Sequence, residues 1–446
     1  MSNGLTSAAF LPVVHQSPVW GSEQVGLQAL RAQAWQVLSL QGLPTRAHEE
    51  WKYTDWQRLL PKVMLMPVVA HALAEITQVT IAAQRLAGCD VLVLVDGVFA
   101  PTLSDQPAGV HVRSLRQVWQ QSQERVLSVL QREQTWAQSP MLALNTALAS
   151  DGLWLEVAEG VQVARPVQVI ALSTSTFPLS SRGLTAEPTS QGNLCNLRHT
   201  LHLGAGSALT LVDDVQASES TLSMINAVWQ GDIGPGASLD YYRVQQSGGE
   251  SVHVSDMRLT QRRNSRVQLF YAGTSGKIGR YDAQVNLAEE GAQCHINGFY
   301  RLQGREHFDV HTTVVHAASH TESHEWIKGV ADAQSHGVFN GKVIVRPGIA
   351  GVVARQSNPN LLLSAQAEID SKPELQIDSD AVQCSHGASV GQLDREALFY
   401  LQSRGIALAD AREMLLGGFL VECWEVVKVP ALREWGVLHI SPSWCN

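Results

Sequence analysis

Four short segments with a shared pattern decide the fold: Gly206-Ser-Ala-Leu-Thr-Leu, Gly236-Ala-Ser-Leu-Asp-Tyr, Asn264-Ser-Arg-Val-Gln-Leu and Gly291-Ala-Gln-Cys-His-Ile. Their first residues lie 30, 28 and 27 positions apart. Each segment begins with a turn-forming residue and continues into a short alternating strand. Turns at a nearly fixed period are typical of a stack of β-coils, because each coil buries its face only against the next. We therefore predict a mainly β protein whose core is a solenoid, a parallel, right-handed β-helix.

An antiparallel sandwich is the alternative, because it also spaces its strands evenly. Strand and turn composition begins after Asp151, in runs such as Leu153-Trp-Leu-Glu-Val. The segment Ser173 to Asn193 is rich in Ser, Thr, Pro and Gly without periodicity, and we expect an exposed loop there. The predicted β-helix core covers residues 151–392.

Residues 1–150 are predicted to form a mixed, largely helical region. Between Gln24 and about Trp136, apolar residues recur at spacings of three and four, for example Leu27, Leu30, Ala34, Val37 and Leu38. The run from Cys89 to Gly97 is different, because its unbroken apolar residues predict a buried strand that ends in a turn.

Residues 393–446 are predicted to be a helical C-terminal region. Its first helix covers Asp394 to Leu401 and stops at Gly405, and its second covers Ala407 to Leu416. Gly417 and Gly418 are expected to end that second helix. The two segments together form a helical hairpin after the β region.

Composition narrows the functional classes. The chain has 446 residues, a net charge of −9 and 45% hydrophobic residues, which fits a well-packed globular protein and disfavours a nucleic-acid partner. The first thirty residues lack the pattern of a secretory signal, and the longest apolar stretch, Val91 to Ala100, is too short to span a bilayer. Six cysteines without short paired spacings indicate neither a disulfide framework nor a zinc knuckle. We expect a soluble, cytoplasmic protein with no membrane or nucleic-acid partner.

Common catalytic motifs are missing. Gly276-Lys277 is followed by Ile278 rather than Ser or Thr, so the phosphate-binding loop of ATPases is not formed. No Gly-x-Gly-x-x-Gly motif follows a strand, and the segment from His324 to Lys328 lacks the second histidine of zinc proteases. We therefore expect that the chain does not hydrolyse ATP itself, and the sequence argues against a nucleotide-cofactor enzyme or a zinc protease.

Histidines are concentrated in one stretch of the predicted core: His295, His307, His311, His316, His320, His324 and His336. His307 and His311 are four residues apart, and so are successive members of the group His316, His320 and His324. Imidazoles at this density are able to bind Fe, Zn or Cu. The more common explanation is that they are outward polar residues on adjacent coils.

Cys384 and His386 form a more specific pair, in the segment Val382-Gln-Cys384-Ser-His386-Gly387. Residues two apart on a strand face the same side, roughly 6 to 7 Å apart at Cα. A thiolate and an imidazole at this distance can share a metal, although two ligands do not complete a site. A buried cysteine beside a hydrogen-bonded histidine is the structural alternative.

The C-terminal part resembles a known family. The string that begins Lys372-Pro-Glu-Leu375, includes Cys384-Ser-His386-Gly-Ala-Ser-Val-Gly391 and continues to Phe419 is similar to the SufB/SufD family of the SUF iron–sulfur cluster assembly machinery. Lys328-Gly329 and Glu50-Trp-Lys-Tyr-Thr54 fit the same family. Ser385-His386-Gly387-Ala388 stands where the SufB branch typically carries Glu-His-Glu-Ala, so the chain looks like the SufD branch.

The resemblance implies a parallel β-helix flanked by helical regions, and a complex with the paralogous SufB and the ATPase SufC. In such a complex this chain is a scaffold subunit without a complete active site of its own. His386 and Cys384 are implied to belong to a site at the SufB junction for iron or a nascent cluster, which is held transiently and shared with the partner. The resemblance implies no cofactor in the isolated chain.

Two interaction surfaces follow as expectations. Leu393 to Val427 is expected to dock SufC, through Phe399, Arg404, Leu415, Leu416 and Phe419, with exposed apolar residues that suit helix-in-groove binding. Plain packing of this segment against the β-helix is the alternative. The last coils, around Leu361 to Gln383, are expected to pair with SufB, or with a second copy of the chain when SufB is missing, because a solenoid presents strand edges only at its ends.

Two other functions remain open. A β-helix enzyme that cleaves polysaccharides is disfavoured by the missing signal and by an aromatic content of only 6%, because sugar grooves favour stacked aromatic rings. A free-standing metallohydrolase that uses His316, His320 and His324 would instead hold stoichiometric metal in the purified chain.

Overall fold

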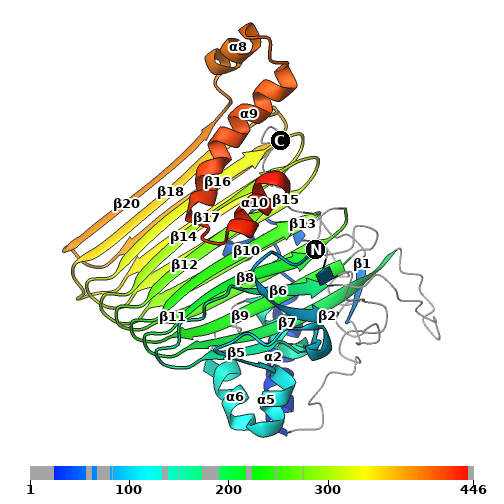
Figure 1. Ribbon diagram of the computed structural model, residues 1–446, viewed down its shortest axis with the longest axis vertical. Coiled ribbons are helices and arrows are strands. Elements are labelled where there is room, and N and C mark those ends of the chain that lie inside the picture. Colours follow the sequence, from blue (N-terminus) through cyan, green and yellow to red (C-terminus); the bar gives the residue numbers. More distant parts are fainter. Residues whose placement is uncertain are drawn as a thin grey trace.

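The computed structural model describes residues 25–56, 63–67, 81–82, 84–132, 139–149, 151–172, 190–216, 223–246, 249–274 and 276–439. Its centre is a parallel β-solenoid of two sheets, and successive strands of the chain alternate between the two sheets (Figure 1). The predicted mainly β solenoid is therefore confirmed. The antiparallel sandwich is wrong, because among the described residues only two short strand pairs, at the N-terminal end of the stack, are antiparallel.

Sheet A contains, in spatial order, β19 (Glu368–Ile377), β17 (His336–Val345), β15 (His307–His316), β13 (Ile278–Leu287), β11 (Val252–Gln261), β9 (Ser223–Ile233), β7 (Ser190–Leu203), β5 (Leu153–Val157) and β4 (Val110–Ser114). β1 (Val63–Pro67) also pairs with β7. Sheet B contains β20 (Val382–Gly391), β18 (Val352–Leu362), β16 (Glu322–Ala331), β14 (Gln293–Leu302), β12 (Arg266–Gly273), β10 (Ser238–Gln246), β8 (Ala208–Gln216), β6 (Val167–Leu172), β2 (Asp90–Val95) and β3 (Val98–Phe99).

The sequence repeat corresponds to the register of sheet B. The first residues of β8, β10, β12 and β14 are paired neighbours. The turn residue two positions before each strand has a positive φ, from 53° at Asn264 to 74° at Gly291. This left-handed conformation favours Gly and Asn, which explains why these two residue types mark the period. His320 (φ 56°) and Gly351 (φ 71°) occupy the next two turns of the same series, so the repeat continues beyond the four recognised segments.

The interior between the sheets holds the main hydrophobic core. Alternate residues of each strand point inward and bury aliphatic and aromatic side chains, such as Leu211 on β8, Leu239 on β10, Leu269 on β12 and Ile296 on β14. Each fully buried side chain of this size contributes about 1.5–3 kcal/mol relative to exposure. The stack of coils thus buries a continuous core that no single coil could form.

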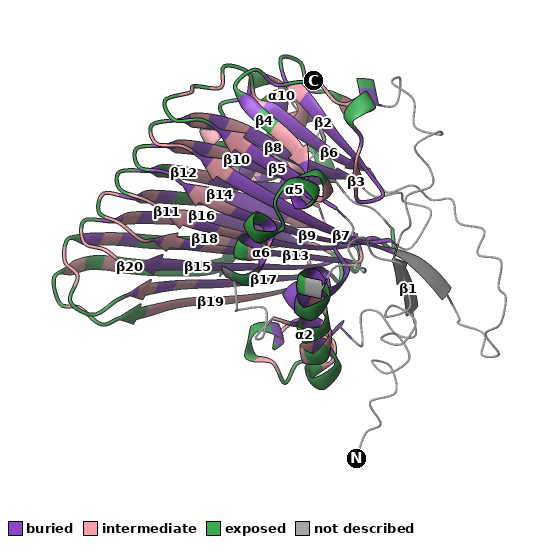
Figure 2. Ribbon diagram, turned by 90° about the horizontal axis from the view of Figure 1, so that it is seen from below, coloured by how far each residue is buried: buried purple, intermediate pink, exposed green. Residues whose placement is uncertain are grey.

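N-terminal helices cover the outer face of sheet A, and Figure 2 shows them beside the strands. They are α2 (Val25–Gln41), α5 (Leu115–Gln121), α6 (Gln123–Arg132) and α7 (Pro140–Leu148). Their apolar side chains pack on outward residues of sheet A such as Met224 and Val252. The predicted apolar stripe of α2 is confirmed, because Leu27, Leu30, Ala34 and Leu38 are buried. The predicted strand from Cys89 is also confirmed: it is β2, which ends at Val95 and is followed by a turn at Asp96 and Gly97, both with positive φ.

C-terminal helices cover part of sheet B. They are α9 (Leu408–Val421) and α10 (Pro430–His439), with a 3-10 turn, η4 (Glu422–Val426), between them. The preceding helix, α8 (Arg395–Ser403), has no buried residue. Trp424 of η4 packs against Phe270 and Phe299 of the sheet. The expectation that Gly417 and Gly418 end the second helix is wrong: α9 continues to Val421, because Leu416 and Leu420 on either side of the glycines are both buried against the sheet.

Three other expectations meet the structure only partly. The segment predicted as an exposed loop, Ser173 to Asn193, lies outside the described residues up to position 189, and β7 begins at Ser190. The division at residues 150 and 392 stays a prediction. Among the described residues, no helix is long and apolar enough to span a membrane.

Candidate functional site

The solenoid has an open end at its last coil. β19 and β20 are the terminal strands of sheets A and B, so each has a neighbour on only one side. Every residue from Ser385 to Gly391 on β20 is exposed. Apolar residues share this exposure, with Ile377 at 38% and Val390 at 48%. Unpaired strand edges carry free N–H and C=O groups, which makes this end of the molecule a template for a further strand.

Cys384 and His386 lie on β20, on the face that continues the solenoid interior. Cys384 pairs with Ala354 and His386 with Gln356 on β18, and both of these β18 residues are buried. The side chain of Cys384 packs against the small apolar group of Val343, Val345, Val352 and Ala354. Partial burial raises the pKa of the Cys384 thiol, which a backbone hydrogen bond from Ala354 partly offsets. His386 is exposed, because no coil follows to cover it.

A polar group continues inward from His386. Gln356 donates through Nε2 to Glu325 Oε2 at 3.1 Å, and Thr312 Oγ1 donates to the same oxygen at 2.7 Å. The other carboxylate oxygen, Oε1, is buried without a hydrogen-bond partner. Burial raises the pKa of Glu325 to about 7, against the lowering effect of the two hydrogen bonds. No motif in the sequence marks Glu325 as a site residue, and the only signal is that it lies on the same inward face of β16 as Ser323 and Ile327.

These donors indicate what the open end is able to bind. A thiolate sulfur and an imidazole nitrogen on one strand face suit iron, zinc or an iron–sulfur cluster. Two ligands leave the coordination of such a metal incomplete. The predicted pair is therefore placed on one face, at the one end of the described solenoid where a second chain has access to both side chains.

The structure separates the histidines that the sequence grouped as His316, His320 and His324. His316 ends β15 inside the solenoid, with its ring nitrogens 2.8 and 2.9 Å from Thr321 Oγ1 and Ser323 Oγ, and burial lowers its pKa to about 4. His320 lies in a turn with positive φ, and His324 lies on the outer face of β16. Their common spacing crosses a turn, so it does not place them on one face. A metallohydrolase built on these three residues has no geometric basis here.

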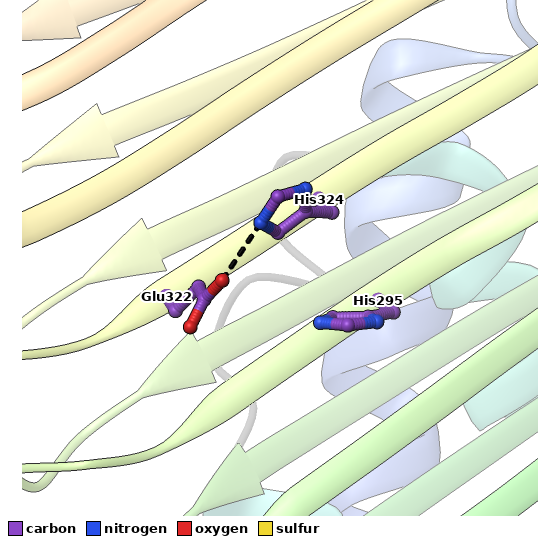
Figure 3. Close-up of side chains that lie close together, drawn as sticks. All are labelled: His295, Glu322 and His324. Carbon is purple, nitrogen blue, oxygen red and sulfur yellow. Dashed lines mark hydrogen bonds and ion pairs between the residues drawn. The ribbon is translucent and has the colours of Figure 1, made fainter.

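A different histidine group comes together on the outer face of sheet B. His295 of β14 pairs in register with His324 of β16, and the ring centroids lie 5.1 Å apart. Glu322 is two residues before His324, and its Oε1 lies at hydrogen-bond distance, 2.8 Å, from His324 Nε2 (Figure 3). Burial, and secondly His324, lower the pKa of His295. The sequence contained the signal, because 29 residues separate His295 from His324, which is close to one coil.

His307, His311 and His336 belong to a third environment, on the outer face of sheet A. His307 contacts Thr54, and His311 lies 3.2 Å from Glu50 Oε2 through Nδ1. His336 Nε2 lies 2.8 Å from Asp370 Oδ2. The outward placement of His307 and His311 on one strand face agrees with their spacing of four.

The N-terminal motif Glu50-Trp-Lys-Tyr-Thr54 docks on this same face. The 3-10 turn η1 (Glu49–Trp51) places the Trp51 ring 3.8 Å from the Arg280 guanidinium carbon, and Arg280 Nη1 donates to the Glu50 carbonyl at 2.7 Å. Lys372 of β19 reaches Glu49 at 2.9 Å. The motif is therefore structural: it fixes the N-terminal segment to sheet A as far as the last coil.

The residues expected to dock an ATPase divide into two groups. Phe399, which is 73% exposed, lies on α8, and Arg404 directly follows this helix. α8 has no buried residue and projects beyond the solenoid (Figure 1). Leu415 and Phe419 are half-buried. The expected exposure of Leu416 is wrong, because it is 1% exposed and packs in the group that contains Trp424. Arg301, which binds Glu413, and Lys328, which donates to the Phe419 carbonyl, hold α9 in this position.

Comparisons with known proteins agree with this architecture. A family model described as "SUF system FeS cluster assembly, SufBD core domain" matches residues 185–419, and one for the "SufBD protein N-terminal region" matches residues 21–169. An iron-sulfur cluster assembly SufBD family protein of Synechocystis is 28% identical, over 94% of this chain and 91% of its own length. The iron-sulfur cluster assembly protein SufD of Escherichia coli is 27% identical, over 90% and 89%. The protein of the same name in Bacillus subtilis is 25% identical, over 66% and 64%. The core-domain match covers more than half of the chain, so this protein belongs to the SufBD family of iron–sulfur cluster assembly proteins.

Proposed function

We propose that this chain is a non-catalytic scaffold subunit of a SUF assembly complex, and that it contributes a ligand to a site shared with SufB. The observation that carries the proposal is the position of Cys384 and His386, inward on a strand that no further coil covers. In the middle of the solenoid, side chains at this position are buried. At the open end the same position is available to a partner.

SufB pairing is proposed at the last coil. β19 and β20 offer two unpaired edges, and Ile377 and Val390 present apolar surface beside them. Strand addition would satisfy the free backbone groups and bury both side chains. A paralogue with the same architecture fits this surface, and so does a second copy of the chain when the paralogue is missing.

His386 is proposed as the iron or cluster ligand from this chain. A neutral imidazole is a competent iron ligand, and exposure leaves it free to rotate toward a partner. Cys384 is proposed as an assisting ligand. Its raised pKa keeps the thiol protonated until a metal or a positive charge arrives, so its contribution is conditional.

The first experiment replaces each ligand in the co-purified complex. His386→Ala is expected to leave the complex assembled but unable to mature a cluster, measured by anaerobic reconstitution and the visible absorption of the cluster. Cys384→Ser is expected to give a milder defect. Cluster formation at the wild-type rate in the His386→Ala complex would show that the imidazole has no ligand role.

SufC docking is proposed at α8 and the following turn rather than at the buried side of α9. Phe399, Tyr400 and Leu408 are more than half exposed there, and Arg404 stacks on Tyr400. Phe399→Asp should abolish co-purification with SufC without a change in the circular dichroism spectrum. Deletion of the whole hairpin is a poorer test, because it would also uncover the sheet under Trp424. Unchanged SufC binding in the Phe399→Asp chain contradicts this placement.

A further inference from the structure

Three side chains with metal-binding atoms meet on the outer face of sheet B, on the opposite face from Cys384 and His386. His295 and His324 come from neighbouring strands in direct register, and Glu322 lies two residues before His324 on the same face of β16 (Figure 3). Their donor atoms all lie within 4.8 Å of one another. The sheet hydrogen bonds fix the three backbone positions, so only side-chain torsions separate the cluster from a coordinating arrangement.

The distances fit a small ion. A first-row metal bound at about 2.1 Å from each donor holds the donor atoms roughly 3–4 Å apart. Glu322 Oε1 and His324 Nε2 are already 2.8 Å apart, and they would open slightly to admit the ion. The His295 ring, inclined at 56° to that of His324, needs to turn its nitrogen toward the same point.

The cluster opens into a hollow of about 500 Å³. Asn297, Trp326 and Arg355 line it on the sheet, Val426 of η4 closes one side, and Ser385 of β20 lies at its far end. The hollow thus extends across sheet B to the strand that carries Cys384 and His386. Arg355 pairs in register with His324, and its positive charge weakens cation binding beside it. An ion here would therefore exchange rather than remain permanently bound.

We propose that His295, His324 and Glu322 bind one divalent first-row transition-metal ion. Two imidazoles and one carboxylate suit Fe²⁺, Co²⁺, Ni²⁺ or Zn²⁺, whereas Mg²⁺ and Ca²⁺ prefer oxygen ligands alone. Three protein ligands leave coordination positions open, which permits the ion to be taken up and passed on. The metal site itself needs no partner subunit. Within the proposed function, this site would load Fe²⁺ for cluster assembly, and that role rests on the proposed function.

The test is a Co²⁺ titration of the untagged chain that carries His386→Ala and Cys384→Ser, so that the open end binds no ion. One Co²⁺ per chain is expected, with a visible d–d absorption band, and anaerobic calorimetry with Fe²⁺ should give the same stoichiometry. His295→Ala and His324→Ala should each weaken binding by at least about 10- to 100-fold, because loss even of an outer-shell partner costs that much. Glu322→Gln should weaken it in the same direction.

His336→Ala is the matched control. His336 also lies 2.8 Å from a carboxylate, that of Asp370, and its ring is 4.9 Å from that of His307. His307 Nε2 lies 2.8 Å from Thr54 Oγ1, and within the described part of the chain this pair belongs to no group of three metal-binding side chains. The control should keep the affinity of the parent chain.

Equal Co²⁺ affinity in the parent, His295→Ala and His324→Ala chains would overturn the proposal, and so would a parent chain that binds no Co²⁺. A loss of affinity in the His336→Ala control equal to that in His324→Ala would also overturn it. None of these results depends on cluster formation. Failure of the metal site is therefore distinguishable from failure of the His386 proposal, which is measured in the assembled complex.

Discussion

The middle coils and the last coil of this solenoid follow the same period and the same register, but they differ in what covers them. β13 and β14 each have a neighbouring strand on both sides, whereas β19 and β20 have one on a single side. Inward residues such as Ile296 are buried in the middle, while the inward Ile377 of the last coil is 38% exposed. The difference leaves the inward side chains of the last coil accessible, and the shared site proposed above depends on that access.

Ion pairs in the middle and at the end of the solenoid differ in exposure in the same way. In the middle, Arg280 binds Asp309 at 2.8 Å with both side chains at 2% exposure or less. Burial alone would raise the pKa of Asp309, but His311 and Arg280 hold it well below its usual range. At the last coil, Lys342 and Glu374 form a cross-strand pair at 2.9 Å with about a third of each side chain exposed. The ion pair in the middle is therefore shielded from water, whereas the pair at the end is partly exposed.

The largest expected effect is a matched pair of core truncations. Ile296→Ala should lower the free energy of unfolding by about 2–5 kcal/mol, because it leaves a cavity in a closed core. Ile377→Ala, the same change at an inward position of the last coil, should cost no more than about 1 kcal/mol in the isolated chain, because more than a third of its side chain is already exposed. Urea denaturation followed by circular dichroism measures both. Equal losses would mean that the last coil is already covered in solution, by a second copy or by another segment.

Addition of the partner sharpens this pair. If SufB covers β19 and β20, Ile377→Ala should weaken the complex although it hardly affects the isolated chain. Ile296→Ala should leave the affinity of the folded chain for SufB unchanged. An affinity loss with Ile296→Ala alone would contradict pairing at the last coil.

Much of this architecture could be predicted because the turns are chemically explicit. Glycine and asparagine are typical of left-handed turns, so the sequence shows the period at Gly206, Gly236, Asn264 and Gly291. His320 adopts the same conformation at the next turn of this series without a residue type that signals it, so the sequence does not show the period there. The prediction that α9 ends at Gly417 and Gly418 is wrong because local preference does not decide the end of this helix. Packing of Leu416 and Leu420 on sheet B overrides the helix-ending preference of Gly417 and Gly418.

The sites differed in how far the sequence determined them. Cys384 and His386 share a strand, so their common face follows from parity alone. His295 and His324 come together only through the register of two strands, which a spacing of 29 residues could have indicated once the period was known. Contacts from outside the repeat, such as Trp51 on Arg280, have no periodic signal and required the structure.

The second prediction concerns the buried carboxyl behind His386. Burial raises the pKa of Glu325 from 4.5 to about 7, so the folded chain binds a proton more tightly than the unfolded chain does. Stability should therefore fall as the pH rises from about 4.5 to about 7, by at most about 3 kcal/mol from this group. Glu325→Gln removes that dependence, and the stability difference between variant and wild type should grow over the same interval. Denaturation at several pH values measures it, and a constant difference would show that Glu325 is ionised in the fold.

The smallest expected effect is at the exposed ion pair of the last coil. Lys342 of β17 and Glu374 of β19 are register partners, with Nζ and Oε1 2.9 Å apart. Solvent screens such pairs, so Glu374→Gln should cost no more than about 0.5 kcal/mol, and less as salt is added. Asp213→Asn in the closed part is the control, because Asp213 binds the fully buried Arg243, and breaking such a pair costs about 3–5 kcal/mol with little dependence on salt. A loss above about 1 kcal/mol for Glu374→Gln would mean that the pair is shielded from water, and the contrast between a closed middle and an open end would then fail at the strand that is proposed to meet SufB.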